Sequence, residues 1–128
     1  MARILIIDDE EAIREMFRDA LEQAGHDVVE AENGQKGIAL QQSVGFDLVI
    51  TDMIMPVQDG IETIKLLHKS YPELPILAIS GGGRMNDLSL LLGAGLEGAA
   101  MTLIKPFTVG KLMDAVGQCF SHGSAHRC

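Results

Sequence analysis

The sequence has little of what several protein classes need. Its 128 residues include two cysteines, one tyrosine and no tryptophan. Cys119 and Cys128 stand near the carboxyl end and form no CxxC pair, which excludes a disulfide framework and argues against a metal or redox pair. No apolar run approaches the roughly 18 residues of a membrane helix. With 47% hydrophobic and 22% charged residues, the composition is that of a globular protein, and we expect no membrane contact.

Positive charge is scarce as well. The chain has 10 lysines and arginines against 18 acidic residues, which gives a net charge of −8. Nucleic-acid binders attract the phosphate backbone with clusters of Lys and Arg, so we expect no direct binding of nucleic acid. The amino-terminal residues lack the longer apolar stretch and the small-residue cleavage site of a signal peptide. We therefore expect a cytoplasmic location.

Five short apolar runs alternate with helical patterns along the chain. The runs, each expected to form a strand, cover residues 4–7, 28–31, 48–51, 76–80 and 99–104. This alternation predicts an α/β fold with a parallel sheet, and runs without polar alternation are typical of strands covered on both faces. Helices are predicted for residues 13–24, after Asn33, for 59–68, for 86–92 and from Thr108 onward.

The polar residues that end these runs indicate the chemistry. In open parallel sheets ligands lie beyond the carboxyl ends of the strands. The residues at those ends are Asp8, Asp9, Asp52, Ser80, Gly81 and Lys105. Crowded carboxylates favour a hard divalent cation, and Mg²⁺ uses few protein ligands together with phosphate oxygens. A carboxylate can attack phosphorus to form an acyl phosphate, while an ammonium, a hydroxyl and a backbone N–H stabilise the transferred oxygens. The pattern therefore predicts phosphoryl transfer.

The same residues, spaced over almost the whole chain, resemble the bacterial response-regulator receiver domain. The matching motifs are Asp8-Asp9, Asp52-Met53-x-Met55-Pro56 with Gly60, Ser80, and Lys105-Pro106-Phe107. The resemblance implies the family's flavodoxin-like (βα)5 fold, with a doubly wound five-stranded parallel sheet in the order 2-1-3-4-5. It also implies that Asp52 accepts the phosphoryl group, and that Asp9, Asp52 and the backbone carbonyl of Ile54 ligate Mg²⁺. Asp8 is expected to help through water.

The resemblance also implies how a signal leaves the site. Lys105 is expected to pair with the phosphoryl group, and Ser80 to move toward it with the loop that begins at Gly81. This motion changes the face formed by the helix at 86–92, the strand at 99–104 and the last helix, which is also a candidate homodimer contact. One residue departs from the family, because Thr102 stands where an aromatic switch residue is usual. We expect transmission through a different group or through loop motion.

Other interpretations remain open from the sequence. An aspartate-nucleophile phosphatase needs a second acid two residues after its nucleophile, where this chain has Ile54. A flavin-binding module needs a phosphate-friendly first loop, where Asp8 and Asp9 repel phosphate. A receiver that acts only as a constitutive interaction module is suggested by Thr102. The Asp8-Asp9 pair alone is typical of a helix cap, and His26 shows no catalytic arrangement around it.

We predict one receiver domain over residues 1–121 and a short disordered tail over 122–128. In that tail His122, His126 and Cys128 form at most a weak metal site. The domain is expected to stand alone as a switch and not as a conventional enzyme. It catalyses only its own phosphorylation, from a histidine kinase or a histidine phosphotransfer protein, and its own dephosphorylation. Its output is expected to pass through contacts with a downstream protein target.

Overall fold

The computed structural model describes residues 2–52, 60–80, 101–104 and 108–127. In chain order the elements are β1 (Arg3–Ile7), α1 (Glu11–Gln23), β2 (Asp27–Ala31), α2 (Gly34–Ser43), β3 (Leu48–Asp52), α3 (Gly60–Ser70), β4 (Ile76–Ser80), β5 (Met101–Ile104) and α5 (Val109–Arg127). Each predicted strand is present, and within the described residues its ends differ from the prediction by one residue at most. Residues 99 and 100 of the last predicted strand lie outside the described residues. The helix predicted for residues 86–92 lies outside the described residues, as do Ile54, Gly81 and Lys105.

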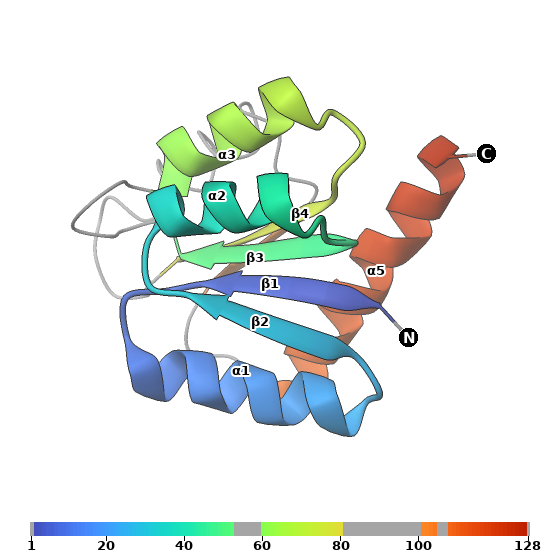
Figure 1. The fold of residues 1–128 in the computed structure, drawn as a ribbon. Coiled ribbons are helices and arrows are strands. Elements are labelled where there is room, and N and C mark those ends of the chain that lie inside the picture. Colours follow the sequence, from blue (N-terminus) through green and yellow to red (C-terminus); the bar gives the residue numbers. More distant parts are fainter. Residues whose placement is uncertain (1, 53–59, 81–100, 105–107, 128) are drawn as a thin grey trace.

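The strands form one parallel sheet in the order β2-β1-β3-β4-β5, which confirms the predicted fold (Figure 1). Every pairing between neighbouring strands is parallel. β1 lies between β2 and β3, with Ile7 opposite both Ala31 and Thr51. Because all the strands run the same way, their carboxyl ends meet along a single edge of the sheet.

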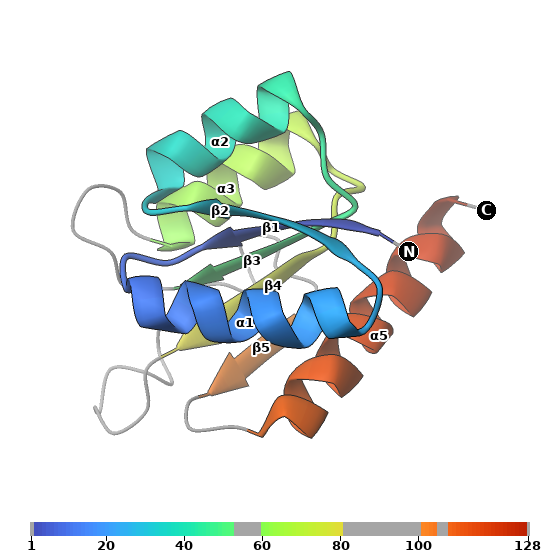
Figure 2. The same cartoon turned by 60° about the horizontal axis from the view of Figure 1, so that its bottom comes forward.

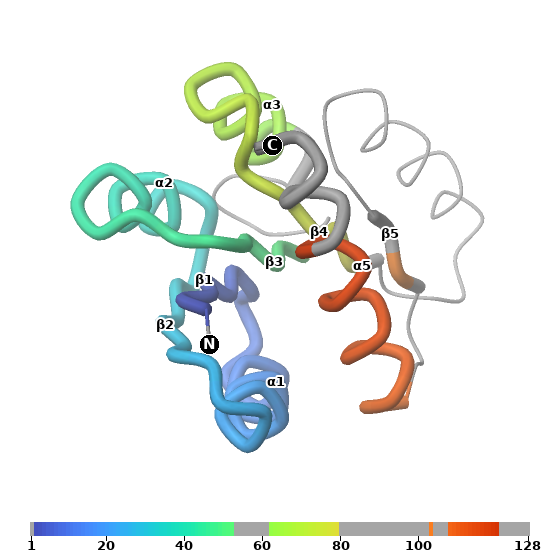
Figure 3. Tube along the Cα trace, turned by 90° about the vertical axis from the view of Figure 1, so that its right-hand side faces the viewer, coloured from blue at the N-terminus to red at the C-terminus, as the bar shows by residue number. Residues whose placement is uncertain are grey.

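Two layers of helices bury the two faces of the sheet. α1 and α5 cover one face, and α2 and α3 cover the other (Figures 2 and 3). Alternate residues of a strand point to opposite faces, so β1 contributes Ile4 and Ile6 to the α1/α5 side and Leu5 and Ile7 to the α2/α3 side. All four are at most 1% exposed. Burial on both sides explains why these strands are apolar without alternation.

Local signals in the sequence set the ends and the approach of the helices. Gly25, at φ 93°, follows the end of α1 in the left-handed region that glycine adopts at little cost. The Asn33 side chain caps α2 by accepting a hydrogen bond from the Lys36 backbone N–H at 2.8 Å. Gly37 lets α2 lie close to β1, since a Cβ at that position would stand 2.3 Å from Ile7 Cδ1.

The last helix differs from the prediction. α5 runs to Arg127 and so includes residues 122–127, which the sequence analysis assigned to a disordered tail. The segment contains no proline, and a single Gly123 costs a helix only about 1 kcal/mol, so no local signal ends the helix earlier. Among the described residues, no helix is both long enough and apolar enough to cross a membrane.

Candidate functional site at the carboxyl edge of the sheet

Two buried carboxylates follow neighbouring strands at the centre of the sheet. Asp52 is the last residue of β3, and Asp8 directly follows β1. Because Ile7 pairs with Thr51 and adjacent strands lie about 4.8 Å apart, Asp8 and Asp52 stand side by side at this edge. Asp8 is 1% and Asp52 7% exposed, which is unusual for ionisable groups.

Hydrogen bonds fix the main chain at both positions. The Asp8 backbone N–H donates to the Ala31 carbonyl at 3.1 Å, which extends the ladder between β1 and β2 by one residue. The Asp8 Oδ1 atom accepts from the Glu10 backbone N–H at 2.9 Å. The buried Thr51 hydroxyl donates to the Asp52 carbonyl oxygen at 3.1 Å. The two carboxylates are therefore presented by an ordered backbone and not by a loose turn.

The segment after β1 gathers oxygen ligands. Carboxylate oxygens of Asp8, Asp9 and Glu10 all lie within 4.8 Å of one another, with Asp8 buried and the other two exposed. Hard divalent cations prefer such oxygen donors, so the residues present fit the predicted Mg²⁺. Asp52 belongs to the next strand and is not one of the three. Glu10 was not among the predicted ligands, although it directly follows the Asp pair in the sequence.

This arrangement also bears on the helix-cap interpretation of Asp8 and Asp9. The N-cap residue of α1 is Glu10, which makes no side-chain cap hydrogen bond. Asp8 bonds the backbone N–H of Glu10, which lies before the first helical residue. The bond therefore shapes the turn between β1 and α1, and it differs from an ordinary helix cap, which accepts from the second or third helical N–H.

The other predicted residues occupy β4, β5 and the loops beyond them. Ser80 is the last residue of β4, one position after Ile79, the register partner of Asp52. Its backbone thus stands at the same edge of the sheet. Thr102 lies in β5 opposite Ala78, further from that edge. Lys105 follows the last residue of β5 in the sequence and lies outside the described residues.

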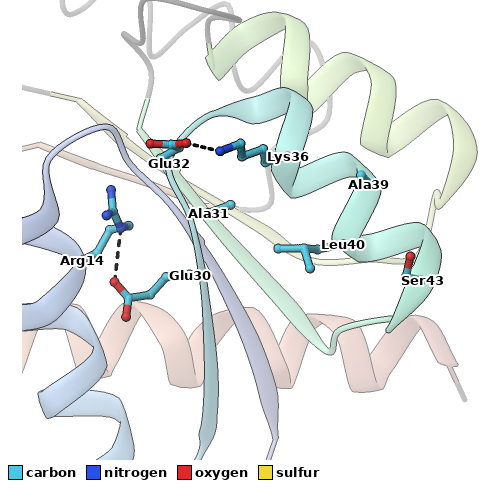
Figure 4. A pocket seen from close by; sticks show the side chains of 8 residues that line it. All are labelled: Arg14, Glu30, Ala31, Glu32, Lys36, Ala39, Leu40 and Ser43. Atoms are coloured by element: carbon cyan, nitrogen blue, oxygen red, sulfur yellow. Dashed lines mark hydrogen bonds and ion pairs between the residues drawn. The ribbon is translucent and has the colours of Figure 1, made fainter.

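A second group of charged residues lies between α1, β2 and α2. Arg14 of α1 binds Glu30 of β2, and Lys36 of α2 binds Glu32. The two ion pairs flank an open cavity of about 520 Å³ between α1, β2 and α2, where Ala31, Ala39, Leu40 and Ser43 complete the lining (Figure 4). Arg14 also reaches the main chain of Asp8. The contacts of Arg14 join separate elements, so no local sequence pattern predicts them.

Comparisons with known proteins point in one direction. Residues 4–117 match the family model described as response regulator receiver domain. The chain is 32% identical over 117 residues to the response regulator protein FleR of Pseudomonas aeruginosa, covering 91% of this chain and 24% of FleR. It is 33% identical over 117 residues to the chemotaxis protein CheY of Bacillus subtilis, covering 91% of this chain and 95% of CheY.

Solved structures agree with these sequence relatives. A response regulator receiver domain protein from Clostridium thermocellum superposes with a TM-score of 0.89 at 31% sequence identity, covering 98% of each chain. The relatives differ in length: the chain spans 24% and 48% of the first two curated relatives but nearly all of CheY.

Proposed function

We infer the function of this chain from the fact that it belongs to the response regulator receiver domain family. Receiver domains are phosphoacceptor signalling domains of two-component systems and not conventional enzymes. We propose that this chain accepts a phosphoryl group on Asp52. The observation that carries the proposal is the placement of two buried carboxylates, Asp8 and Asp52, on adjacent strands at the carboxyl edge of the sheet.

The proposed chemistry is the formation and hydrolysis of an acyl phosphate. An Asp52 carboxylate oxygen attacks the phosphorus of a phosphohistidine, the P–N bond breaks, and the imidazole leaves with the electron pair. Water attack on the phosphorus later releases inorganic phosphate and restores the carboxylate. Asp8, Asp9, Asp52 and the Ile54 carbonyl would hold Mg²⁺, which when bound neutralises charge on the transferred oxygens.

The remaining site residues are proposed to bind the phosphoryl group and to transmit its presence. Lys105 would pair with a phosphoryl oxygen, while the Ser80 hydroxyl and the Gly81 N–H would donate to others. The movement of these residues on phosphorylation would alter the surface that includes β5 and α5. Thr102 lies in β5 without an aromatic ring, so we propose that the loop after β4 carries more of the change than it does in relatives that have the ring.

The proposed partners follow from this chemistry. A histidine kinase or a histidine phosphotransfer protein supplies the phosphoryl group, and a downstream protein target recognises the altered face. A second copy of the chain is a further candidate for that face. Family membership favours this function over the phosphatase and the flavin-binding module. The constitutive interaction module is the alternative that remains, and it predicts no response to phosphorylation.

Intact-protein mass spectrometry after incubation with acetyl phosphate tests the proposal. Wild type should gain the mass of one phosphoryl group in the presence of Mg²⁺ and none in EDTA. Asp52→Ala should gain none under either condition, whereas Asp19→Ala, which removes an exposed carboxylate of α1, should react like wild type. If no adduct forms, or if it persists in Asp52→Ala, the assignment of Asp52 is wrong.

A further inference from the structure

Arg14 of α1 binds two other segments of the chain at once. Its Nη1 donates to the backbone carbonyl oxygen of Asp8 at 2.7 Å, and its Nε donates to Glu30 Oε1 of β2 at 3.2 Å. The Arg14 side chain is 15% exposed, and it lines the open cavity between α1, β2 and α2. Hydrogen bonds of a partly shielded charged group are stronger than those of a fully exposed one, because water competes less for them.

The bond to Asp8 restrains the chain where the sheet no longer does. β1 ends at Ile7, and the Asp8 N–H makes one further ladder bond to Ala31. The Asp8 carbonyl oxygen and the Asp9 N–H belong to one planar peptide unit. A hydrogen bond from Arg14 to that carbonyl oxygen therefore restrains the orientation of the peptide plane between Asp8 and Asp9. The Asp9 carboxylate is exposed, yet lies within 4.8 Å of those of Asp8 and Glu10.

Glu30 orients Arg14 and compensates its charge. A guanidinium is planar with donors at fixed angles, so two bonded N–H groups define its orientation. The second Glu30 oxygen accepts from Arg18 Nη1 at 2.9 Å, and Arg18 in turn binds Glu22. An uncompensated cation beside the carboxylates would repel a divalent metal ion. The pair with Glu30 lets Arg14 approach the site at a smaller electrostatic cost.

We propose that Arg14, oriented by Glu30, is a positioning residue that sets the Asp8-Asp9 geometry for a divalent cation. The inference deepens the proposed function and rests on its cation site. It assigns a task at that site to a residue that would not itself touch the metal ion. Loss of the guanidinium removes none of the carboxylates of Asp8, Asp9 and Glu10. It should nevertheless lower the affinity of the site for Mg²⁺.

Positioning and charge predict opposite effects of the same substitution. Arg14→Gln removes a positive charge close to the site, and by charge alone the more negative site should bind Mg²⁺ more tightly. If Arg14 positions the peptide instead, Mg²⁺ binding should weaken. Arg18→Gln is the matched control, because it removes the same charge from the same helix and the same partner, Glu30, without a bond to Asp8.

Isothermal titration with Mg²⁺ alone, on the unphosphorylated protein, measures the effect. We expect Arg14→Gln to raise the dissociation constant by about tenfold, the lower end of what the loss of an outer-shell partner costs a metal site. Arg18→Gln should bind within about twofold of wild type, because Arg18 is exposed and salt screens the interactions of exposed charges. If Arg14→Gln does not fold, Arg14→Lys replaces it, since a single ammonium cannot reproduce the planar two-donor geometry.

A backbone signal separates positioning from general destabilisation. In ¹⁵N-labelled protein without metal, loss of the donor on the Asp8 carbonyl should shift the Asp9 amide resonance in Arg14→Gln but not in Arg18→Gln. Unchanged or tighter Mg²⁺ binding in Arg14→Gln, with wild type binding normally, overturns this inference and leaves the proposed function intact. Failure of wild type itself to bind Mg²⁺ overturns both.

Discussion

At the scale of single residues, His26 joins the beginning of the chain to its last helix. The Ala2 backbone N–H donates to His26 Nδ1 at 3.1 Å, and the imidazole ring lies 5.6 Å from the ring of Phe120 on α5. Burial lowers the pKa of His26 below its ordinary value, with a smaller contribution from the positive amino terminus. Protonation would also convert Nδ1 from an acceptor into a donor, which is incompatible with the bond from Ala2.

This arrangement predicts a pH dependence of stability that belongs to His26. In the unfolded chain histidine titrates near pH 6.5, and in the folded protein it titrates lower. The unfolded state therefore binds more protons below about pH 6.5, so the His26 contribution is complete above that pH and is lost as the pH falls toward the folded pKa. Urea unfolding of wild type and His26→Gln should show a free-energy difference that shifts against wild type between pH 7.5 and 5.5. A difference that stays constant over this range would show that His26 carries no such linkage.

The sequence could not reveal this role. It places His26 after a glycine at a helix end, which by local pattern is an ordinary surface position. Its partner Phe120 is distant in the sequence, and the contact exists only because α1 and α5 cover the same face of the sheet. Arg14 gave no signal for the same reason. Asp8 and Asp52 could be singled out as candidates because each directly follows an apolar run, and Asp9 stands next to Asp8.

At the scale of elements, α2 shows why a helix with a poor apolar pattern can still be well packed. Its buried positions are Gly34, Gly37 and Gln41, which form no apolar stripe. α2 lies close to β1 because Gly37 has no side chain at the point of contact with Ile7. A pattern search based on hydrophobic residues therefore gives a weak signal here, although the Asn33 cap correctly marks the start of α2.

The close approach predicts that Gly37→Ala destabilises the protein. The new Cβ would lie 2.3 Å from Cδ1 and 2.7 Å from Cγ1 of Ile7, a side chain that is 1% exposed and has little room to move. Overpacking costs about 1–3 kcal/mol, and two such short contacts with a buried side chain favour the upper part of that range. The cost then outweighs the roughly 1 kcal/mol that alanine gains over glycine in a helix. Denaturant unfolding should report the net loss.

Two further variants test the cause. Gly117→Ala in α5 places its Cβ in open space and should instead stabilise the protein, by up to about 1 kcal/mol. Adding Ile7→Val to Gly37→Ala removes the Cδ1 atom that is approached most closely. The double variant should therefore lose less stability than the sum of the two single variants, and simple additivity would refute the packing explanation.

At the scale of the whole molecule, the net charge of −8 and the cluster of Asp8, Asp9 and Glu10 both lower the free energy of unfolding. Like charges held together by folding repel one another and lower the stability of the native state. The sequence predicts this much, because both the composition and the strand-end positions can be read from it. It does not show how closely the three carboxylates meet, since that depends on the turn between β1 and α1.

A cation that binds the folded state alone should therefore stabilise the whole domain. At a free Mg²⁺ concentration 100 times the dissociation constant, the gain in unfolding free energy is about 2.7 kcal/mol. Thermal unfolding should show a rise of several degrees in Tm, measured against KCl at equal ionic strength, because any salt screens a net charge of −8.

Asp9→Asn separates specific binding from screening. Without Mg²⁺ the variant should be at least as stable as wild type, because one carboxylate of the crowded group has lost its charge. With Mg²⁺ it should gain much less than wild type, because a neutral amide is a poorer ligand for a hard cation than a carboxylate. The two melting curves should thus approach or cross as Mg²⁺ is added. Equal gains in both proteins would mean that Mg²⁺ acts as a general salt, and that the carboxylates after β1 do not form the cation site.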